Sequence, residues 1–308
     1  MMRSNQERIN NIYKKVSVYH KERKKKIIKL SVFACIAFIT VNVIIYAEMN
    51  RNKPDDVYKN DKKGIYVSAA TLSAISKEAS DISDMKPLIL FNENVYTFDQ
   101  SLRCNETIKK SLLGEYLGNA SGSLSESQNK DGYKEFASTS TGKVFSINNY
   151  DIDFRIGIYH EENSYIELYN KLNDIYLDKG KDLYEEKLSL KYNYADVLYQ
   201  THVDYMNIMD NYKECSEKMK QNDMDEFIDA LYNSSFVKMS NQEEVEKIPN
   251  YDTDKDKIAH LYFKMDNGTT VKMTLYKNGY ILYGDMCRVY VNMNDKIFDK
   301  IFNSIVSD

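Results

Sequence analysis

The chain has 308 residues, 43% of them hydrophobic, with a formal net charge of −4. Residues 1–29 hold ten lysines and arginines against two acidic residues, a net charge of +8, so the remainder carries −12. Because phosphate binding needs a concentrated basic face, this acidic remainder excludes nucleic acid as a partner. The length is sufficient for one large domain or two small ones.

The first residues predict a short amphipathic helix at residues 5–22, where apolar side chains recur at helical spacing. A basic cluster follows, which consists of Arg23, Lys24, Lys25, Lys26 and Lys29. Such a segment either lies on an anionic inner leaflet or holds a cytoplasmic regulator, and it is too short for a folded domain.

An uncharged run, Leu30–Ala47, stands directly behind this cluster. With the two isoleucines before Lys29, it reaches the roughly 20 residues that cross a bilayer core, so we expect a transmembrane helix at residues 27–47. The side chains expected to anchor it are Leu30, Phe33, Ile36, Phe38, Val41, Ile44 and Ile45. Because the basic residues come first, the positive-inside rule places residues 1–26 in the cytoplasm and residues 48–308 outside the cell membrane.

Three other interpretations of this run are weaker: a cleaved signal peptide, a lipoprotein and a buried helix of a soluble protein. A cleaved signal peptide has a short basic region and a small-residue cleavage site, whereas here the basic region is long and no such site follows. A lipoprotein would be modified at Cys35, but Phe33 is too bulky for that motif and the apolar sequence continues beyond the cysteine.

The outer part of the chain is expected to begin with a polar stalk at residues 48–84, which contains a helix at residues 65–84. Residues 85–205 then predict an α+β unit. Its expected elements are a hairpin at 88–98, a helix at 106–117, an exposed loop at 119–143, three strands between 144 and 169, and an extended segment at 195–205.

The last third of the chain predicts a helical connector at residues 206–255 and a four-stranded meander with a final helix at residues 256–308. Asn267-Gly268 is the preferred two-residue hairpin turn, and Asp295 caps a helix with one apolar face. The expected fold class is therefore α+β: a single N-terminal transmembrane helix followed by an extracytoplasmic region with two antiparallel β units packed with helices.

An acidic stretch before the meander has the beginning of a calcium-binding pattern. Asp252, Asp254 and Asp256 alternate as in such a loop. The loop also needs a glycine and a glutamate at positions that Lys257 and Phe263 occupy here. We therefore interpret the stretch as an acidic turn and expect no metal site there.

No enzymatic activity and no cofactor are expected. Ser140 and Lys143 have the S-x-x-K spacing of penicillin-recognising enzymes, but the S-D-N and K-T-G elements that accompany it are absent. The four histidines are scattered, and His260 is interpreted as a strand-surface residue. Three cysteines lie outside the apolar run: Cys104, Cys215 and Cys287. Their wide spacing predicts either three buried or free thiols, or one disulfide bridge and one thiol.

The chain holds 26 tyrosines and no tryptophan. Several tyrosines fall in the first β unit and form a candidate aromatic recognition face there: Tyr96, Tyr116, Tyr150 and Tyr159. The alternative is a mixed set of core and surface residues in a chain that is rich in tyrosine throughout.

Three segments resemble a module found in membrane-anchored Firmicutes proteins: Leu88–Thr97, Leu113–Gly118 and Lys143–Arg155. Some of these proteins resemble the membrane-bound regulators, anti-sigma-factor-like proteins included, that accompany extracytoplasmic-function sigma factors. The resemblance covers about residues 85–235 and implies no catalytic residues. The basic helix before the apolar run is similar to a truncated form of the N-terminal segment in such regulators.

We therefore expect a single-pass sensor or regulator of cell-envelope signalling. Its outer region would bind a ligand or a protein of the membrane or envelope, and the membrane span would couple it to a cytoplasmic regulator on residues 1–26. The alternative is a structural or accessory envelope protein with an inert anchor. A wall-active hydrolase is disfavoured because no motif brings a nucleophile, a base and an oxyanion donor together.

Overall fold

The computed structural model describes residues 64–68, 87–124, 134–191, 193–207, 212–217, 219–239, 242–284, 286 and 289–307. The predicted amphipathic helix, the predicted membrane anchor at residues 27–47 and most of the predicted stalk lie outside these described residues. Within the described ranges, no helix combines the length and the apolar character needed to cross a membrane.

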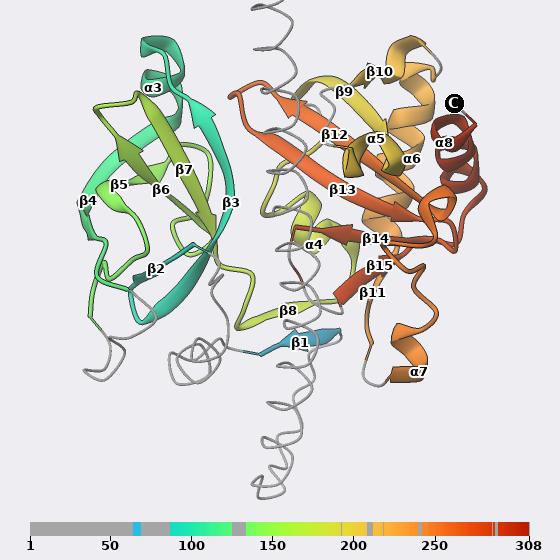
Figure 1. Ribbon diagram of the computed structural model, residues 1–308, viewed down its shortest axis with the longest axis horizontal. Coiled ribbons are helices and arrows are strands. Elements are labelled where there is room, and N and C mark those ends of the chain that lie inside the picture. Colours follow the sequence, from blue (N-terminus) through green and yellow to red (C-terminus); the bar gives the residue numbers. More distant parts are fainter. Residues whose placement is uncertain are drawn as a thin grey trace, which may run out of the picture. The chain divides into compact units, whose positions relative to one another are not determined.

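The expected α+β fold class is wrong, because strands dominate the part of the chain that the structure describes. These strands form a six-stranded sheet, a seven-stranded sheet and a two-stranded ribbon, all antiparallel (Figure 1). Within the described ranges the helices are short, and the longest of them has 13 residues. Abundant β-branched and aromatic residues in alternating patterns favour strands, and they outweigh the helices that were expected in several segments.

The six-stranded sheet is built mainly from the predicted first unit. Across the sheet its strands are β2 (Leu88–Phe91), β3 (Asn94–Arg103), β7 (Tyr165–Asn170), β6 (Arg155–His160), β5 (Thr141–Ile147) and β4 (Leu113–Ser121). The predicted first hairpin is confirmed, and Asn92 and Glu93 make its turn with φ of 50° and 62°. Both residues adopt the left-handed conformation that a type I′ turn requires.

The edges of this sheet are linked by residues 134–140, which were expected to be exposed loop. Leu90 N donates to Ala137 O at 2.8 Å on the β2 side, and Ser121 N donates to Phe136 O at 3.0 Å on the β4 side. The sheet therefore curls around an apolar interior that includes Tyr96 and Tyr169 (Figure 1). Satisfying both edges in this way removes unpaired strand edges from solvent.

Helix α3 (Glu106–Leu112) covers part of the other face of the sheet. Asn105 caps it by accepting a hydrogen bond from Ile108 N, as capping residues do. The helix was expected to continue to residue 117, but it ends at Leu112 and the chain runs directly into β4. Pairing of β4 with β5 outweighs the helical preference of this segment.

The seven-stranded sheet contains the predicted meander, β12 to β15, and three further strands. Its order is β10 (Lys213–Glu214), β9 (Tyr194–Thr201), β12 (Ile258–Met265), β13 (Thr270–Tyr276), β14 (Tyr280–Tyr283), β15 (Val289–Asn292) and β11 (Ser235–Lys238). The four meander strands and the turn at Gly268, with φ of 87°, are confirmed. The expected helical connector is wrong in part, since β10 and β11 belong to this sheet.

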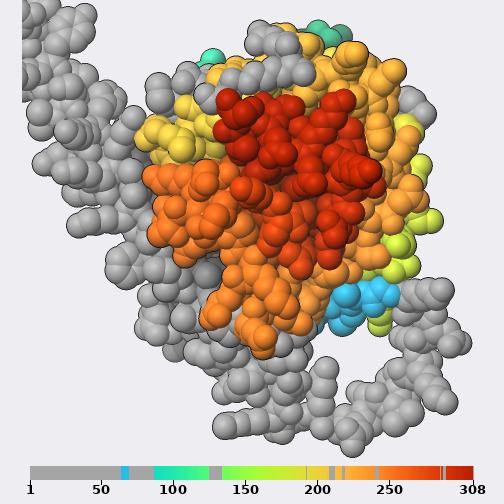
Figure 2. Space-filling model, turned by 90° about the vertical axis from the view of Figure 1, so that its right-hand side faces the viewer, coloured from blue at the N-terminus to red at the C-terminus, as the bar shows by residue number. Residues whose placement is uncertain are grey.

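Helices cover one face of this sheet and bury its largest apolar cluster. The chief ones are α6 (Gln221–Asn233) and the confirmed final helix α8 (Lys296–Val306). Figure 2 looks onto the side of the molecule where the C-terminal residues lie. The remaining short helices are α4 (Gly180–Tyr184), α5 (His202–Met206), α7 (Gln242–Val245) and the 3₁₀ turns η1 (Cys215–Glu217) and η2 (Lys255–Lys257).

The helix expected at residues 65–84 does not begin as predicted, because β1 (Ile65–Val67) is a strand. It pairs with β8 (Ile175–Leu177) in the two-stranded ribbon. Gly64 precedes it with φ of +113°, and a Cβ at this position would lie 2.6 Å from Leu177 O. Glycine is therefore required where the chain approaches β8.

Candidate functional site

The face of the seven-stranded sheet opposite α6 and α8 carries polar and aromatic side chains. On β12, Ala259, Leu261 and Phe263 belong to the apolar cluster under the helices. Successive strand residues point to opposite faces, so His260 and Tyr262 lie on the other side. Gln200 on the neighbouring β9 shares that side, because its side chain accepts a hydrogen bond from Tyr262 OH at 3.0 Å.

Two histidines meet beneath this face. His202 Nδ1 and His260 Nε2 are 2.9 Å apart, although 58 residues separate them in the chain. Both side chains are fully buried, with 0% exposure. The pairing of β9 with β12 brings them together, since Thr201 stands opposite Ala259 and α5 begins at the next residue.

Their hydrogen bonds determine the tautomer of each ring. His202 Nε2 lies 2.8 Å from Tyr251 O, and a carbonyl can only accept, so Nε2 carries the proton. His202 Nδ1 must then accept from His260 Nε2, which leaves His260 Nδ1 to accept from the Thr274 hydroxyl at 3.2 Å. The result is a continuous chain of hydrogen bonds between neutral groups.

Aromatic rings cover this pair. The Tyr205 ring of α5 lies 4.2 Å from the His260 ring, and the Tyr251 ring lies 4.3 Å from the His202 ring. Helix α5 is held at its start by Thr201, whose hydroxyl accepts from Asp204 N at 3.2 Å. Figure 1 shows α5 on the sheet beside β9 and β12.

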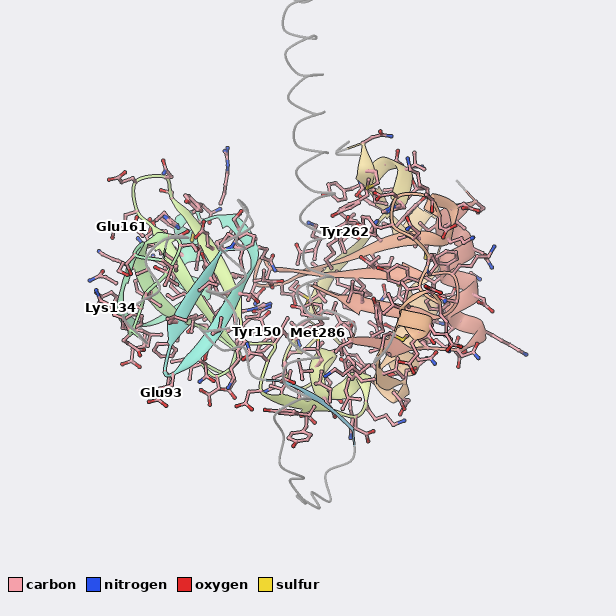
Figure 3. All side chains as sticks on the ribbon, turned by 60° about the horizontal axis from the view of Figure 1, so that its bottom comes forward. Glu93, Lys134, Tyr150, Glu161, Tyr262 and Met286 are labelled. Carbon is pink, nitrogen blue, oxygen red and sulfur yellow. The ribbon has the colours of Figure 1, made fainter. Side chains whose placement is uncertain are left out.

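Cations and tyrosines alternate around the covered pair. Lys272 Nζ lies 4.1 Å from the centre of the Tyr205 ring, and Lys264 Nζ lies 5.9 Å from that of Tyr212. The Tyr212 ring meets Tyr262 edge-on at 5.1 Å and is 46% exposed. We name these five residues the aromatic–lysine face; Figure 3 labels Tyr262 within it.

Burial controls the titration of these groups. Desolvation, with the positive charge of Lys272 and the neighbouring His202, lowers the pKa of His260 well below its ordinary value. Desolvation also lowers the pKa of His202. Desolvation raises the pKa of Tyr262 and of Tyr251. At neutral pH the two histidines, Tyr251 and Tyr262 are therefore uncharged.

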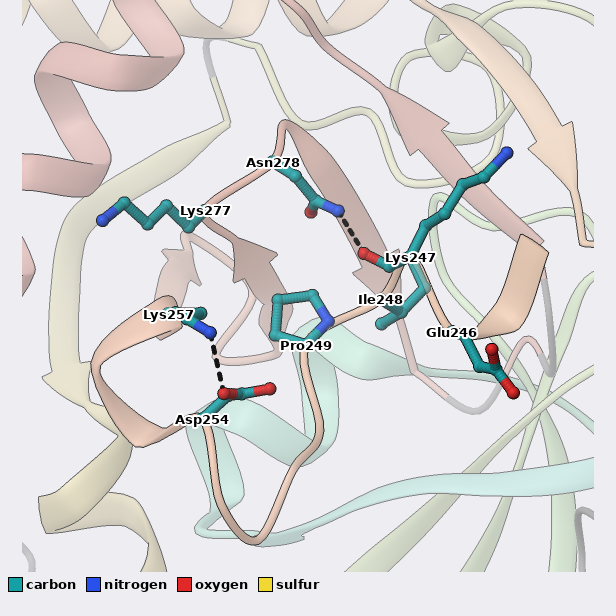
Figure 4. Close-up of a pocket in the computed structure, with 8 residues that line it drawn as sticks. All are labelled: Glu246, Lys247, Ile248, Pro249, Asp254, Lys257, Lys277 and Asn278. Atoms are coloured by element: carbon teal, nitrogen blue, oxygen red, sulfur yellow. Dashed lines mark hydrogen bonds and ion pairs between the residues drawn. The ribbon is translucent and has the colours of Figure 1, made fainter. Parts of the chain in front are cut away.

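A pocket of about 280 Å³ lies beside the loop that carries Tyr251 (Figure 4). Its lining includes Ile248 and Pro249 of this loop, with Lys277 on the turn after β13. Lys257 Nζ donates to Asp254 Oδ1 at 2.8 Å, and this contact lowers the pKa of Asp254. The pocket therefore combines two apolar residues with charged and polar side chains, among them this ion pair.

Several chemistries lack support in the described part of the chain. No group of three or more histidine, cysteine, aspartate or glutamate side chains is placed there to hold a metal ion. Ser140 Oγ lies 3.4 Å from Tyr169 OH, whereas Lys143 Nζ contacts Glu161 at 2.7 Å. The serine and lysine of the S-x-x-K pattern thus contact different partners.

The predicted recognition tyrosines do not share one surface. Tyr96 is fully buried inside the curled sheet and donates to Ile152 O at 2.9 Å. Tyr150 OH lies 3.2 Å from Thr269 Oγ1, between the two sheets (Figure 3). Tyr116 is 49% exposed, while Tyr159 is buried.

Tyr116 and Tyr159 are connected through a third ring. Phe145 lies 5.6 Å from Tyr116 and 6.5 Å from Tyr159. The membrane-anchor side chains and the basic cluster before them lie outside the described residues.

Sequence reasoning missed the histidine pair. His260 was interpreted as a surface residue, although it is fully buried. One available signal was the alternation on β12, which places His260, Tyr262 and Lys264 on the same side. The identity of the residues opposite them depends on pairing with distant strands.

No protein-family model, no curated protein and no solved structure matches this chain. The geometry of the aromatic–lysine face and the pattern of the sequence are therefore the basis of the functional conclusion.

Proposed function

We propose that this chain is a non-enzymatic protein of the cell envelope whose β region binds a ligand or a neighbouring protein through the aromatic–lysine face. The observation that carries the proposal is the exposed Tyr212 ring, packed on Tyr262 and flanked by Lys264. Tyrosine joins a large apolar ring to a polar tip, which suits it to contact surfaces. Val203 of α5 is 47% exposed and adds apolar area.

The support for a binding face is its fixed geometry. Tyr205 is held by packing on the His260 ring and Tyr262 by a hydrogen bond to Gln200 of β9, so little side-chain freedom would be lost on binding. The lysines over the rings add a positive charge that favours an anionic or electron-rich partner. These are features of recognition and involve no reacting group.

The sequence supports the placement in the envelope. In this proposal the apolar run at residues 30–47 holds the chain at the membrane, with residues 1–26 in the cytoplasm and the β region outside. Binding outside would then be conveyed to a cytoplasmic regulator, as in the anti-sigma-like proteins that the chain resembles. The second candidate is an accessory envelope protein with an inert anchor.

The test of the binding face is crosslinking in intact cells with a tagged full-length chain. We expect Tyr212→Ala to lose at least one envelope component that the unaltered chain captures. Tyr116→Ala is the matched control, because Tyr116 of β4 is 49% exposed and Tyr212, which precedes β10 of the other sheet, is 46% exposed. Identical capture by both variants would contradict a role for this face.

The two candidates are separated by exchanging residues 1–47 for an unrelated membrane anchor. If the chain is a regulator, it should lose its cytoplasmic crosslinks and its signalling to the cytoplasm after this exchange. Full function with the foreign anchor would instead establish the accessory protein.

A further inference from the structure

A single hydrogen-bonded chain connects four separate segments beneath the aromatic–lysine face. It runs from Thr274 on β13 through His260 on β12 and His202 at the start of α5 to the carbonyl of Tyr251. Tyr251 belongs to the loop at residues 248–254, which lines the pocket with Ile248 and Pro249. One of the contacts that hold this loop on the sheet is thus a hydrogen bond from an imidazole ring.

We propose that the His202–His260 pair is an acid-sensitive latch, which holds α5 and the loop 248–254 on the sheet at neutral pH and releases them when it is protonated. The proposal concerns the movement of this cover and stands whether or not the aromatic–lysine face is the binding face.

The first argument is the geometry of the donors. Each ring nitrogen of His202 is already used, with Nε2–H directed at Tyr251 O and Nδ1 accepting from His260. A proton added to Nδ1 would face the Nε2–H of His260 across 2.9 Å. Two donors cannot share that distance, so a protonated His202 keeps this contact only if His260 moves its proton to Nδ1 and donates it to Thr274. A second proton on the pair breaks the chain at its centre.

Protonation of His260 has a different cost. Its Nδ1 faces the Thr274 hydroxyl, which can turn to accept. The resulting imidazolium would be fully buried, and Lys272 on β13 already acts on it as a nearby positive charge. A buried cation without a counter-charge is strongly disfavoured, so the charged ring is driven towards solvent.

The charges around the pair do not offset this cost. Lys272 from β13 and Lys255 from η2 disfavour a positive His202, while Asp252 of the loop favours it. Asp204 of α5 is engaged by the Thr201 hydroxyl at 2.9 Å. The other titratable neighbours are tyrosines, namely Tyr205, Tyr251, Tyr262 and Tyr276, and burial raises the pKa of Tyr251 and of Tyr262.

Release has a defined consequence. The loop loses its hydrogen bond to His202, while Asn278 Nδ2 still donates to Lys247 O at the start of the segment (Figure 4). The loop can therefore swing from the sheet without detaching from the turn after β13. The ring of Tyr205, which packs on His260, becomes exposed.

The test is hydrogen–deuterium exchange of the full-length chain at pH 7.5, 6.5 and 5.5, corrected for intrinsic exchange with an unstructured peptide. Opening that takes up one proton should become about tenfold more favourable for each pH unit below the ordinary histidine pKa of about 6.5. We expect this increase in peptides that cover residues 202–207 and 248–254. Peptides from α3, which lies on the other sheet, should keep their protection.

The variants are His202→Gln with His260→Gln, and His160→Gln as the matched control. The double variant should lose the pH-dependent change in residues 248–254, and the control should retain it because His160 lies on β6. Unchanged exchange of the unaltered chain between pH 7.5 and 5.5 would overturn the proposal. The proposal would also be overturned if a folded double variant showed the same increase in exchange of residues 248–254 at low pH.

If the double variant does not fold, the imidazole resonances of the unaltered chain decide the question. Titration of His202 and His260 in step with the exposure of residues 248–254 supports the latch. Titration of both rings while these residues stay protected refutes it.

Discussion

Gln100 and Thr270 exchange two hydrogen bonds between the two large sheets. Gln100 Nε2 donates to Thr270 O at 2.8 Å, and Thr270 N donates to Gln100 Oε1 at 2.9 Å. A side-chain amide on β3 thus satisfies both backbone groups at the start of β13, as a neighbouring strand would. Both sheets belong to the compact unit of residues 60–72 and 86–308.

We expect Gln100→Ala to lower the free energy of unfolding by about 1–3 kcal/mol, because two backbone groups of Thr270 lose their partner in a partly buried place. Denaturant titration followed by circular dichroism measures this loss. Gln100→Glu has the same shape but keeps only an acceptor, so it should still receive the bond from Thr270 N and lose the other. A Gln100→Ala variant as stable as the parent would show that water replaces the amide without cost.

Arg155 of β6 also contacts the seven-stranded sheet, because its Nη2 donates to Tyr283 OH of β14 at 3.3 Å. It is 1% exposed and donates to Asn170 Oδ1 at 2.7 Å and to Asp99 Oδ2 at 2.8 Å. Arg155→Met should cost about 3–5 kcal/mol, because it leaves Asp99 beside the junction without its partner. Lys143→Met, which removes an exposed pair with Glu161, should cost less than about 1 kcal/mol. Equal losses in the two variants would contradict this ranking.

Acid should destabilise the fold through the histidine pair. The pKa values of His202 and His260 are lowered in the folded state, so the unfolded chain binds protons that the folded chain does not. The free energy of unfolding should be constant above about pH 7.5 and fall below about pH 6.5 by about 1.4 kcal/mol per pH unit for each histidine.

Urea titrations between pH 8 and pH 5 measure this slope. His260→Gln removes one of the two titrating groups and should flatten the curve, whereas His160→Gln should leave this part of the slope in place. A stability that does not change between pH 8 and pH 5 would contradict the lowered pKa values.

The buried thiols should be unreactive in the folded protein. Cys104 and Cys215 are free and buried, and desolvation raises the pKa of Cys215 to about 12 and that of Cys104 in the same direction. The thiolate is the reactive form, so neither residue should be alkylated at pH 7.5 until the chain is unfolded. Mass spectrometry after brief treatment with iodoacetamide, with and without denaturant, tests this. Rapid labelling of Cys215 in the folded chain would contradict its burial.

Gly180 lies where α4 meets α6. A Cβ at this position would stand 2.0 Å from Leu231 O, which is backbone and cannot turn away. Gly180→Ala should therefore cost about 1–3 kcal/mol as overpacking, although alanine is the better helix former. Lys181→Ala, at an exposed position of the same short helix, is the control and should change stability little. A stable Gly180→Ala chain would mean that α4 can shift away from α6.

Local patterns predicted many of the elements correctly. The asparagine–glycine turn at residues 267–268, the alternation along β12 and β13, and the apolar face of α8 each follow from neighbouring residues. Errors arose where pairing with a distant strand outweighed local preference. Residues 113–117 were expected to be helical but pair with β5, and residues 65–67 pair with β8.

The sequence by itself therefore determined the turns, the strand periodicity and which side chains of β12 share a face. Only the tertiary structure decided which strands are neighbours, because strand pairing joins residues that are far apart in the chain and each register is chosen by the packing of the whole sheet. The contact of His202 with His260 depends on such a choice, since β9 lies beside β12 only in the folded sheet. The contact of Gln100 with Thr270 likewise joins residues of two different sheets.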